Sequence, residues 1–241
     1  LQRWKDGDPP LPEGHKAAQE AFSAFMRQAR SNFADLIVGA MAERMIPVGF
    51  RTAVDGDVTG DAEAAAVWQR AGMDVQSADV HDMMLSLSEA YVIVGEVDEE
   101  TGAPVITAEE PHTMVGEPDP AVPSRLRAAL KVVHDDIDEV DRAYLYLPGE
   151  VWVAIRPAKG QTGPALFFDP RAWSWDPQRG GDEGQRLRHN RMPVVRFANK
   201  DGLGEFEPHL DLLHRINTQV LQRMVIATMQ AFRQPAVKNL P

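Results

Sequence analysis

The residues best suited to catalysis or metal binding lie in one short acidic run. It places five carboxylates directly after His134: Asp135, Asp136, Asp138, Glu139 and Asp141. Carboxylate oxygens bind divalent cations, and a bound cation can drive phosphate-ester hydrolysis. Spaced acids on a turn also commonly face water. The run therefore leaves open a metal-dependent phosphoesterase site and a solvated turn, and we favour the turn.

The histidines do not form a metal-binding motif. His209 and His214 are five residues apart in one predicted helix, whereas a spacing of four directs two histidines at one metal. We expect both to lie on a polar helix face. His81-Asp82 and His134-Asp135-Asp136 could join a metal site only with distant carboxylates, and no paired motif supports this.

Other reaction classes lack the residues that they need. The chain has no cysteine, which excludes thiolate nucleophiles and disulfides. The segment from Gly56 to Gly60 has no Gly-Lys-Ser/Thr sequence, and Gly202-Leu203-Gly204 lacks a third glycine. No Gly-x-Ser-x-Gly elbow occurs. We therefore predict no catalytic residue, no cofactor site and no metal site, and we expect the protein not to be an enzyme.

A second cluster combines arginines with aromatic rings between residues 171 and 196. Its members are Arg171, Trp173, Trp175, Arg179, Arg186, Arg188, His189, Arg191 and Arg196. Such a set can stack on nucleic acid, so a monomeric nucleic-acid-binding adaptor stays open. Nearby acids dilute the charge, and we favour a loop that packs on a neighbouring subunit.

The charge along the chain is uneven. The 241 residues carry a net charge of −11, and residues 51–150 alone hold 6 basic and 22 acidic side chains. Residues 151–241 hold 13 basic and 8 acidic ones. A tight DNA-binding protein usually has a basic face, so the middle of the chain should repel DNA. No run of about 18 apolar residues predicts a membrane span.

Helical and strand patterns succeed one another along the chain. Helices are predicted over residues 16–29, from a cap at Asn32 to Pro47, from a cap at Asp61 to Ala71, and over 75–90. Strands are predicted over 48–52, 91–94, 104–107, 112–115, 126–133, 142–146, 151–155 and 193–197, with mostly irregular chain over 157–193. The pattern indicates an α+β fold with antiparallel sheets.

One long helix is predicted from about Glu207 to Arg233. Pro208 suits its first turn, and about 26 residues would span roughly 40 Å. We expect its apolar stripe to have no partner within its own chain, so that copies of the chain in a ring would cover it. We therefore predict an oligomer interface formed by Leu210, Leu213, Ile216, Val220 and Met224. Because Pro235 disfavours helix at the residue before it, residues 236–241 are expected to leave the helix axis.

Four blocks, in order, resemble the portal proteins of tailed phages that infect actinobacteria. The first is the aromatic and Pro-rich segment 4–12, and the second comprises Asn32-Phe33, Ala42-Glu43-Arg44 and Val48-Gly49-Phe50-Arg51. The third comprises Trp68-Gln69, Met73-Asp74 and Tyr91-Val92-Ile93-Val94. The fourth, and most specific, comprises Glu205-Phe206-Glu207, Arg215-Ile216-Asn217 and Ala231-Phe232-Arg233-Gln234. The chain departs from the family pattern at Ser88-Glu89-Ala90, where a glycine-containing turn is usual, and at His214 and Pro235-Ala236.

The resemblance implies a non-enzymatic portal subunit in a dodecameric ring at a capsid vertex. The ring is the conduit for DNA packaging and ejection, with double-stranded DNA passing through without sequence-specific binding. Its implied partners are terminase, capsid proteins and the head–tail adaptor, with no membrane, in a virion assembled in the host cytoplasm. Residues 1–204 would form the wing region and residues 205–241 the first stem helix. The chain would then be a fragment, with the clip and crown beyond Pro241.

Overall fold

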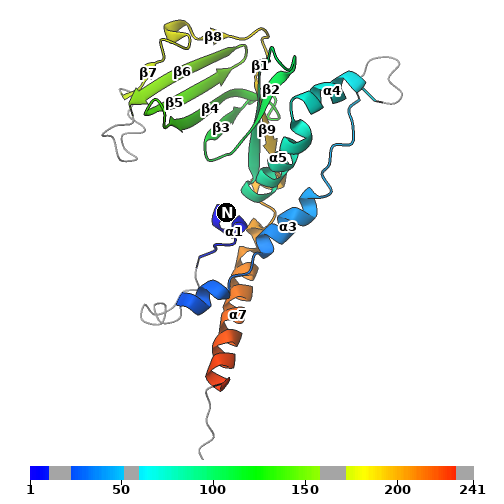
Figure 1. Ribbon diagram of the computed structural model, residues 1–241, viewed down its shortest axis with the longest axis vertical. Coiled ribbons are helices and arrows are strands. Elements are labelled where there is room, and N and C mark those ends of the chain that lie inside the picture. The colour runs from blue at the N-terminus through cyan, green and yellow to red at the C-terminus, as the bar shows by residue number, and fades with distance from the viewer. Residues whose placement is uncertain (11–22, 52–59, 158–171, 232–241) are drawn as a thin grey trace, which may run out of the picture.

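The computed structural model describes residues 1–10, 23–51, 60–157 and 172–231. They form an α+β body of helices and two antiparallel sheets, from which a long C-terminal helix projects (Figure 1). The predicted fold class is confirmed.

The smaller sheet joins distant parts of the chain. Its strands lie in the order β2-β1-β9, with bounds Pro104–Glu109, Glu89–Val97 and Val194–Ala198. Both β2 and β9 pair antiparallel to β1. The strands predicted over 91–94, 104–107 and 193–197 are confirmed, each with slightly wider or shifted bounds.

The larger sheet contains the predicted meander. Its path is β3-β4-β5-β6-β7, with β8 also paired to β6. The bounds are Met114–Pro118, Leu126–Asp135, Val140–Leu147, Glu150–Pro157, Ser174–Trp175 and, for β8, Gln185–Arg186. Because β4, β5 and β6 are joined by tight turns, successive turns lie at opposite ends of the sheet. The turn after β4 is therefore at the end away from the turn after β5.

The helix α5 packs on the smaller sheet and shorter helices pack against α5; two of the helices begin at predicted caps. The helices are α1 (Gln2–Lys5), α3 (Phe33–Ala42), α4 (Ala62–Arg70) and α5 (Met73–Leu87), with a further helical segment at residues 23–28. The Asn32 side chain accepts a hydrogen bond from the Asp35 N–H at 3.3 Å, and that of Asp61 accepts one from the Ala64 N–H at 2.8 Å. Each bond satisfies an N–H that has no partner within its helix.

The main apolar core lies where α3, α5, β1 and the start of the long helix meet. It includes the buried residues Val38, Leu85, Val92, Phe206 and Leu213. The chain enters this core through Gly204, where an added Cβ would lie 2.6 Å from the Ser86 carbonyl oxygen. Only glycine permits this close backbone approach.

A second core holds the two sheets together. Tyr91 of β1 lies against Met114, Leu126 and Tyr146 of the larger sheet. Its hydroxyl accepts a hydrogen bond from the Gly116 N–H at 3.0 Å. Burial raises the pKa of Tyr91 to about 12, so the phenol stays neutral and the packing between the sheets persists across ordinary pH.

The long helix α7 spans Leu210–Ala231 and follows a 3-10 turn at Glu207–His209 that contains Pro208. The predicted helical start at Glu207 is therefore a 3-10 turn, with regular α-helix only from Leu210. The 22 residues of α7 extend roughly 33 Å. The predicted helix end at Arg233 and the expected departure of residues 236–241 lie outside the described residues.

Several local predictions are wrong. Residues 48–51 form no strand, and Val48 is 99% exposed, because no other described strand lies alongside to pair with them. The helix capped by Asn32 ends at Ala42, before Pro47. The strand predicted from residue 112 begins at Met114. The helical prediction over 16–22 and the turn at 55–57 lie outside the described residues.

A serine occupies the turn between α5 and β1. Ser88 has φ 77°, in the left-handed region, which costs about 1–2 kcal/mol for a residue with a Cβ. A glycine at this position would avoid that cost, but glycine also has more conformational freedom in the unfolded chain, which offsets part of the gain in stability. We expect Ser88→Gly to raise the free energy of unfolding by about 0.5–1 kcal/mol in urea denaturation.

Ser88→Ala is the matched control, because it removes the hydroxyl and keeps the Cβ. It should give no comparable gain in stability. A Gly variant no more stable than the Ala variant would show that the left-handed turn carries no such cost.

Candidate functional site

The first half of α7 is held by its own chain. Leu213 is 5% exposed and belongs to the main core, and Leu210 packs against the same core. Asn217 is buried, and its Oδ1 accepts hydrogen bonds from the N–H and the hydroxyl of Ser31 at 3.1 and 2.5 Å. The expectation that this helix lacks a partner within the chain is therefore wrong for this half, where Leu213 is a core residue.

The other predicted interface residues remain partly accessible. Ile216, Val220 and Met224 are half-buried and follow Leu213 at spacings of three and four. The structure thus brings all five predicted residues to one side of α7. Two of them anchor the helix, and three continue the stripe beyond the core.

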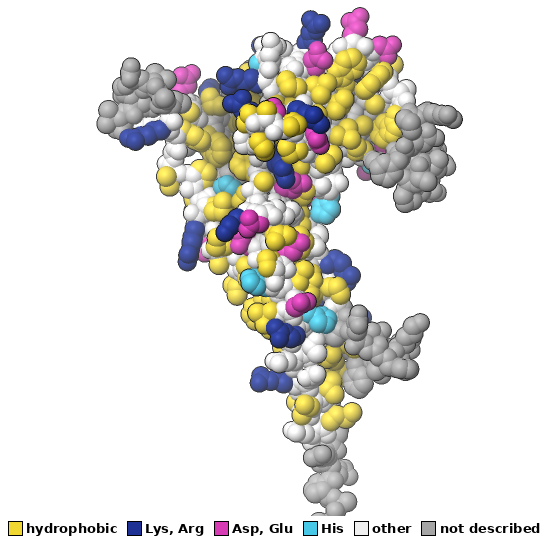
Figure 2. All heavy atoms as spheres, turned by 180° about the vertical axis from the view of Figure 1, so that it is seen from behind, with side chains coloured by type: hydrophobic (Ala, Val, Ile, Leu, Met, Phe, Trp, Pro, Cys, Tyr) yellow, Lys and Arg dark blue, Asp and Glu magenta, His cyan; other side chains and the backbone are white. Residues whose placement is uncertain are grey.

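Beyond Met224 the helix carries apolar side chains on a second side as well. Ile226 is 55% exposed and Met229 is 61% exposed. Figure 2 shows hydrophobic side chains reaching the surface along the shaft below the body. A helix that is apolar on several sides normally lies buried between neighbours. Ile226 and Met229 lie outside the single predicted stripe, although the apolar run Met224-Val225-Ile226 could have indicated them.

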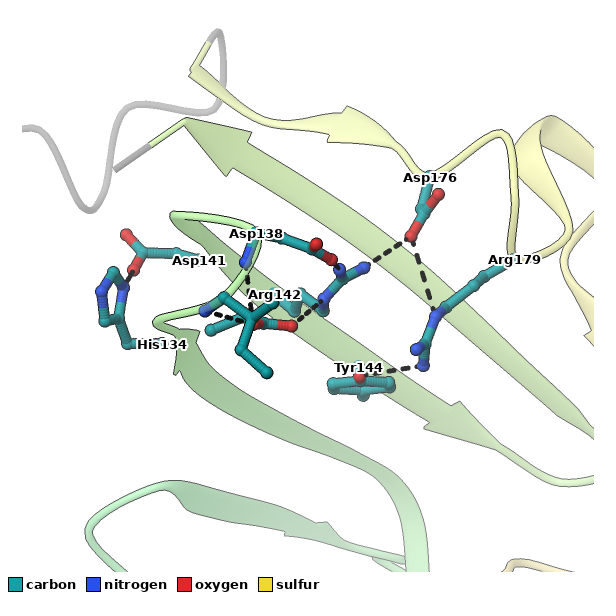
Figure 3. A network of polar contacts seen from close by, with 9 residues as sticks. His134, Asp138, Asp141, Arg142, Tyr144, Asp176 and Arg179 are labelled. Carbon is teal, nitrogen blue, oxygen red and sulfur yellow. Dashed lines mark hydrogen bonds and ion pairs between the residues drawn. The ribbon is translucent and has the colours of Figure 1, made fainter. Parts of the chain in front are cut away.

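The acidic run lies at the β4–β5 end of the larger sheet, around the buried guanidinium of Arg142 (Figure 3). Its Nε lies 3.1 Å from Asp135 Oδ2 and its Nη1 lies 3.0 Å from Asp176 Oδ2. Asp138 contacts Nη2 of the same guanidinium. The side chains of Arg142 and Asp176 are only 10% and 4% exposed. One arginine thus neutralises carboxylates from a turn and from a distant loop.

A second arginine, Arg156, pairs with Asp141, the carboxylate of the run that lies on β5. Arg156 Nε lies 2.9 Å from Asp141 Oδ2, and His134 Nδ1 lies 2.8 Å from Asp141 Oδ1. Partial burial opposes ionisation of Asp141, but the hydrogen bonds from Arg156 and His134 outweigh it and lower its pKa. The bond to Asp141 in turn raises the pKa of His134.

The phosphoesterase alternative requires three or more metal-binding side chains close together. In the described part of the chain, no group of at least three His, Asp or Glu side chains is placed to hold a metal ion. Three carboxylates of the run, Asp135, Asp138 and Asp141, instead contact Arg142 or Arg156. Sequence reasoning missed Arg156 because it lies on the neighbouring strand β6, and it overlooked Arg142, which directly follows Asp141 in the chain.

The arginine-rich segment is also engaged within the chain. Arg179 donates to the Tyr144 hydroxyl at 3.1 Å, Arg188 lies 3.3 Å from Glu96, and Arg196 lies 2.7 Å from Glu89. Trp175 packs against Trp152 with ring centroids 5.2 Å apart. Arg171 lies outside the described residues. The described part of this cluster is thus partly used to fix the loop on the sheet.

No protein-family model matches the chain, and a search of curated proteins finds no match. Among the described residues, no helix combines the length and the apolar character needed to cross a membrane. Function is therefore inferred from the chain's own residues and their geometry.

Replacing Arg142 should destabilise the fold. Arg142→Met leaves the nearly buried Asp176 without its main counter-charge, and breaking a buried pair costs on the order of 3 kcal/mol. We expect a loss of that size in urea denaturation. Arg127→Met is the control, because the Arg127–Glu117 pair is more than half exposed on both sides and should contribute at most about 1 kcal/mol. Equal losses in the two variants would mean that Arg142 is not central to the sheet end.

His134 should make stability depend on pH. Its folded-state pKa lies above the ordinary 6.5, so its contribution is full below pH 6.5 and disappears as the pH rises through the folded-state value. We expect His134→Gln to lower the melting temperature more at pH 5.5 than at pH 8.5, measured by differential scanning fluorimetry. His112→Gln, at a surface position 3.9 Å from Glu110, is the control. A His134 effect that does not change with pH would contradict the prediction.

Proposed function

We propose that this protein is a subunit of a phage portal: a non-enzymatic ring at a capsid vertex through which double-stranded DNA enters and leaves. The observation that carries the proposal is a long helix, rooted in the core of the body, whose far end exposes apolar side chains. The ordered blocks of portal resemblance along the chain support the same function.

The geometry of α7 favours association with other copies. The helix is fixed at its start by Leu213 and by Phe206, which precedes it, and then extends beyond the body (Figure 1). Ile226 and Met229 lie beyond the part that the body covers. Parallel copies around a rotation axis would bury them against one another, because each copy presents the same helix at the same height.

The charge of the chain suits a channel through which DNA must slide. Each phosphate that a protein neutralises adds salt-dependent affinity, and a tightly held duplex would not move. A net charge of −11 reduces such binding. In this proposal the terminase hydrolyses ATP and supplies the force, while the portal ring provides the docking surface for terminase and for the head–tail adaptor.

Assembly of the purified chain tests the proposal. We expect rings, with twelve subunits by the resemblance, in native mass spectrometry and negative-stain electron microscopy. The double variant Ile226→Glu/Met229→Glu should require a protein concentration roughly tenfold higher for assembly, because it places charge where apolar side chains would be buried.

Gln178→Glu/Gln185→Glu is the matched control, since it adds the same charge at exposed polar positions of the body, away from α7. This control should assemble close to the parent. If the parent stays monomeric at every concentration, the portal proposal fails. If both double variants assemble equally well, the helix end is not a contact between subunits.

A further inference from the structure

A basic pocket lies at the end of the larger sheet opposite the acidic turn. The pocket has a volume of about 610 Å³, and its lining includes Arg125, Leu126, Pro148, Asn190, Arg191 and Met192. Arg125 and Arg191 are exposed and form no ion pair with any described residue. Asp119 also lines the pocket, and its carboxylate accepts a hydrogen bond from the Ala121 N–H at 2.8 Å. The site thus combines the charges of Arg125 and Arg191 with the carboxylate of Asp119, and Leu126 and Met192 are among its apolar lining residues.

The β4–β5 turn has the complementary character. Ile137 at its tip is 93% exposed, and the neighbouring Asp136 side chain is 95% exposed. The turn is held in shape because Asp135 accepts hydrogen bonds from the N–H groups of Ile137 and Asp138 at 3.0 and 3.2 Å. Arg142 braces it from beneath. A preformed apolar tip beside an acid loses little conformational entropy on docking.

The sheet topology keeps the tip and the pocket of one chain apart. Strand β4 begins at Leu126, which lines the pocket, and ends at Asp135, which holds the turn. Its 10 residues separate the two surfaces by roughly 33 Å. A chain therefore does not fill its own pocket. Two copies can join head to tail, and such a contact repeats from copy to copy until the rotation closes a ring.

We propose that the β4–β5 turn of one copy docks into the basic pocket of the next copy around the ring. Ile137 would pack against Met192, and Asp136 would face Arg125 and Arg191. This inference rests on the proposed function, because it names the surfaces that meet in the portal ring. The partner is a second copy of this chain. It is favoured because the two surfaces carry opposite charges and lie at opposite ends of the sheet.

Engineered cysteines test the contact directly, because the natural chain has none. In Ile137→Cys/Asn190→Cys, each copy carries one thiol at the tip and one at the pocket rim. Disulfides form only when the two Cα atoms come within about 7 Å. Mild oxidation of the assembled protein should therefore give a ladder of linked multimers on non-reducing gels. The control Ile137→Cys/Val75→Cys pairs the tip with a 70% exposed position on α5 and should give no ladder.

The outcomes separate this contact from the function on which it rests. Rings with a 137–190 ladder support both. Rings in which the 137–190 pair links no more than the control overturn the contact and leave the portal function standing. A parent chain that stays monomeric, with no ladder in the variant, overturns both.

A charge exchange checks the chemistry of the contact. Adding Arg191→Glu to the linking variant should slow ladder formation roughly tenfold through like-charge repulsion with Asp136. Adding Asp136→Lys as well should restore the rate, because the lysine of one copy then faces the glutamate of the next. If neither substitution changes the rate of ladder formation, charge does not select this partner.

Discussion

The burial of Phe206 sets the direction of the long helix. Its ring is fully buried where α3, α5, β1 and α7 meet, and the chain reaches it through the close approach of Gly204 to Ser86. The backbone N–H of Glu205 donates to the Leu85 carbonyl at 2.7 Å, which fixes the segment against the end of α5. Since Phe206 precedes the helix by only a few residues, the packing of one ring determines how α7 leaves the body.

Local signals in the sequence predicted much of the fold. The caps at Asn32 and Asp61 need only a side chain and an N–H three residues later, and the β4–β6 meander needs only alternation and turn residues. These were confirmed. The segment at 48–51 carried a strand-like pattern, but a strand also needs a neighbour, which the pattern does not report.

The candidate sites were harder to predict than the fold, because they depend on contacts between residues that are far apart in the sequence. Asp176 meets Arg142 across 34 positions and Ser31 meets Asn217 across 186, so spacing alone could not reveal either. The carboxylates at 135–141 were noticed as a group; Arg142 directly follows them in the chain, whereas Arg156, which contacts Asp141, lies on the next strand, β6. Leu213 belonged to the predicted stripe, yet its neighbours in space are core residues far away in the chain. Periodicity identifies the apolar side of a helix but does not say which molecule covers it.

The described contacts that anchor α7 to the body lie at one end of the helix. The anchoring residues Leu210, Leu213 and Asn217 lie in its first turns, so a small change of packing at this root would be amplified along the helix. Over a length of roughly 33 Å, a rotation of about 10° at the root would displace the far end by about 6 Å. In the ring that we propose, a slight concerted tilt of the bodies would widen or narrow the bore between the helix ends. The width of the passage would then be controlled from the periphery, with no change in the helices themselves.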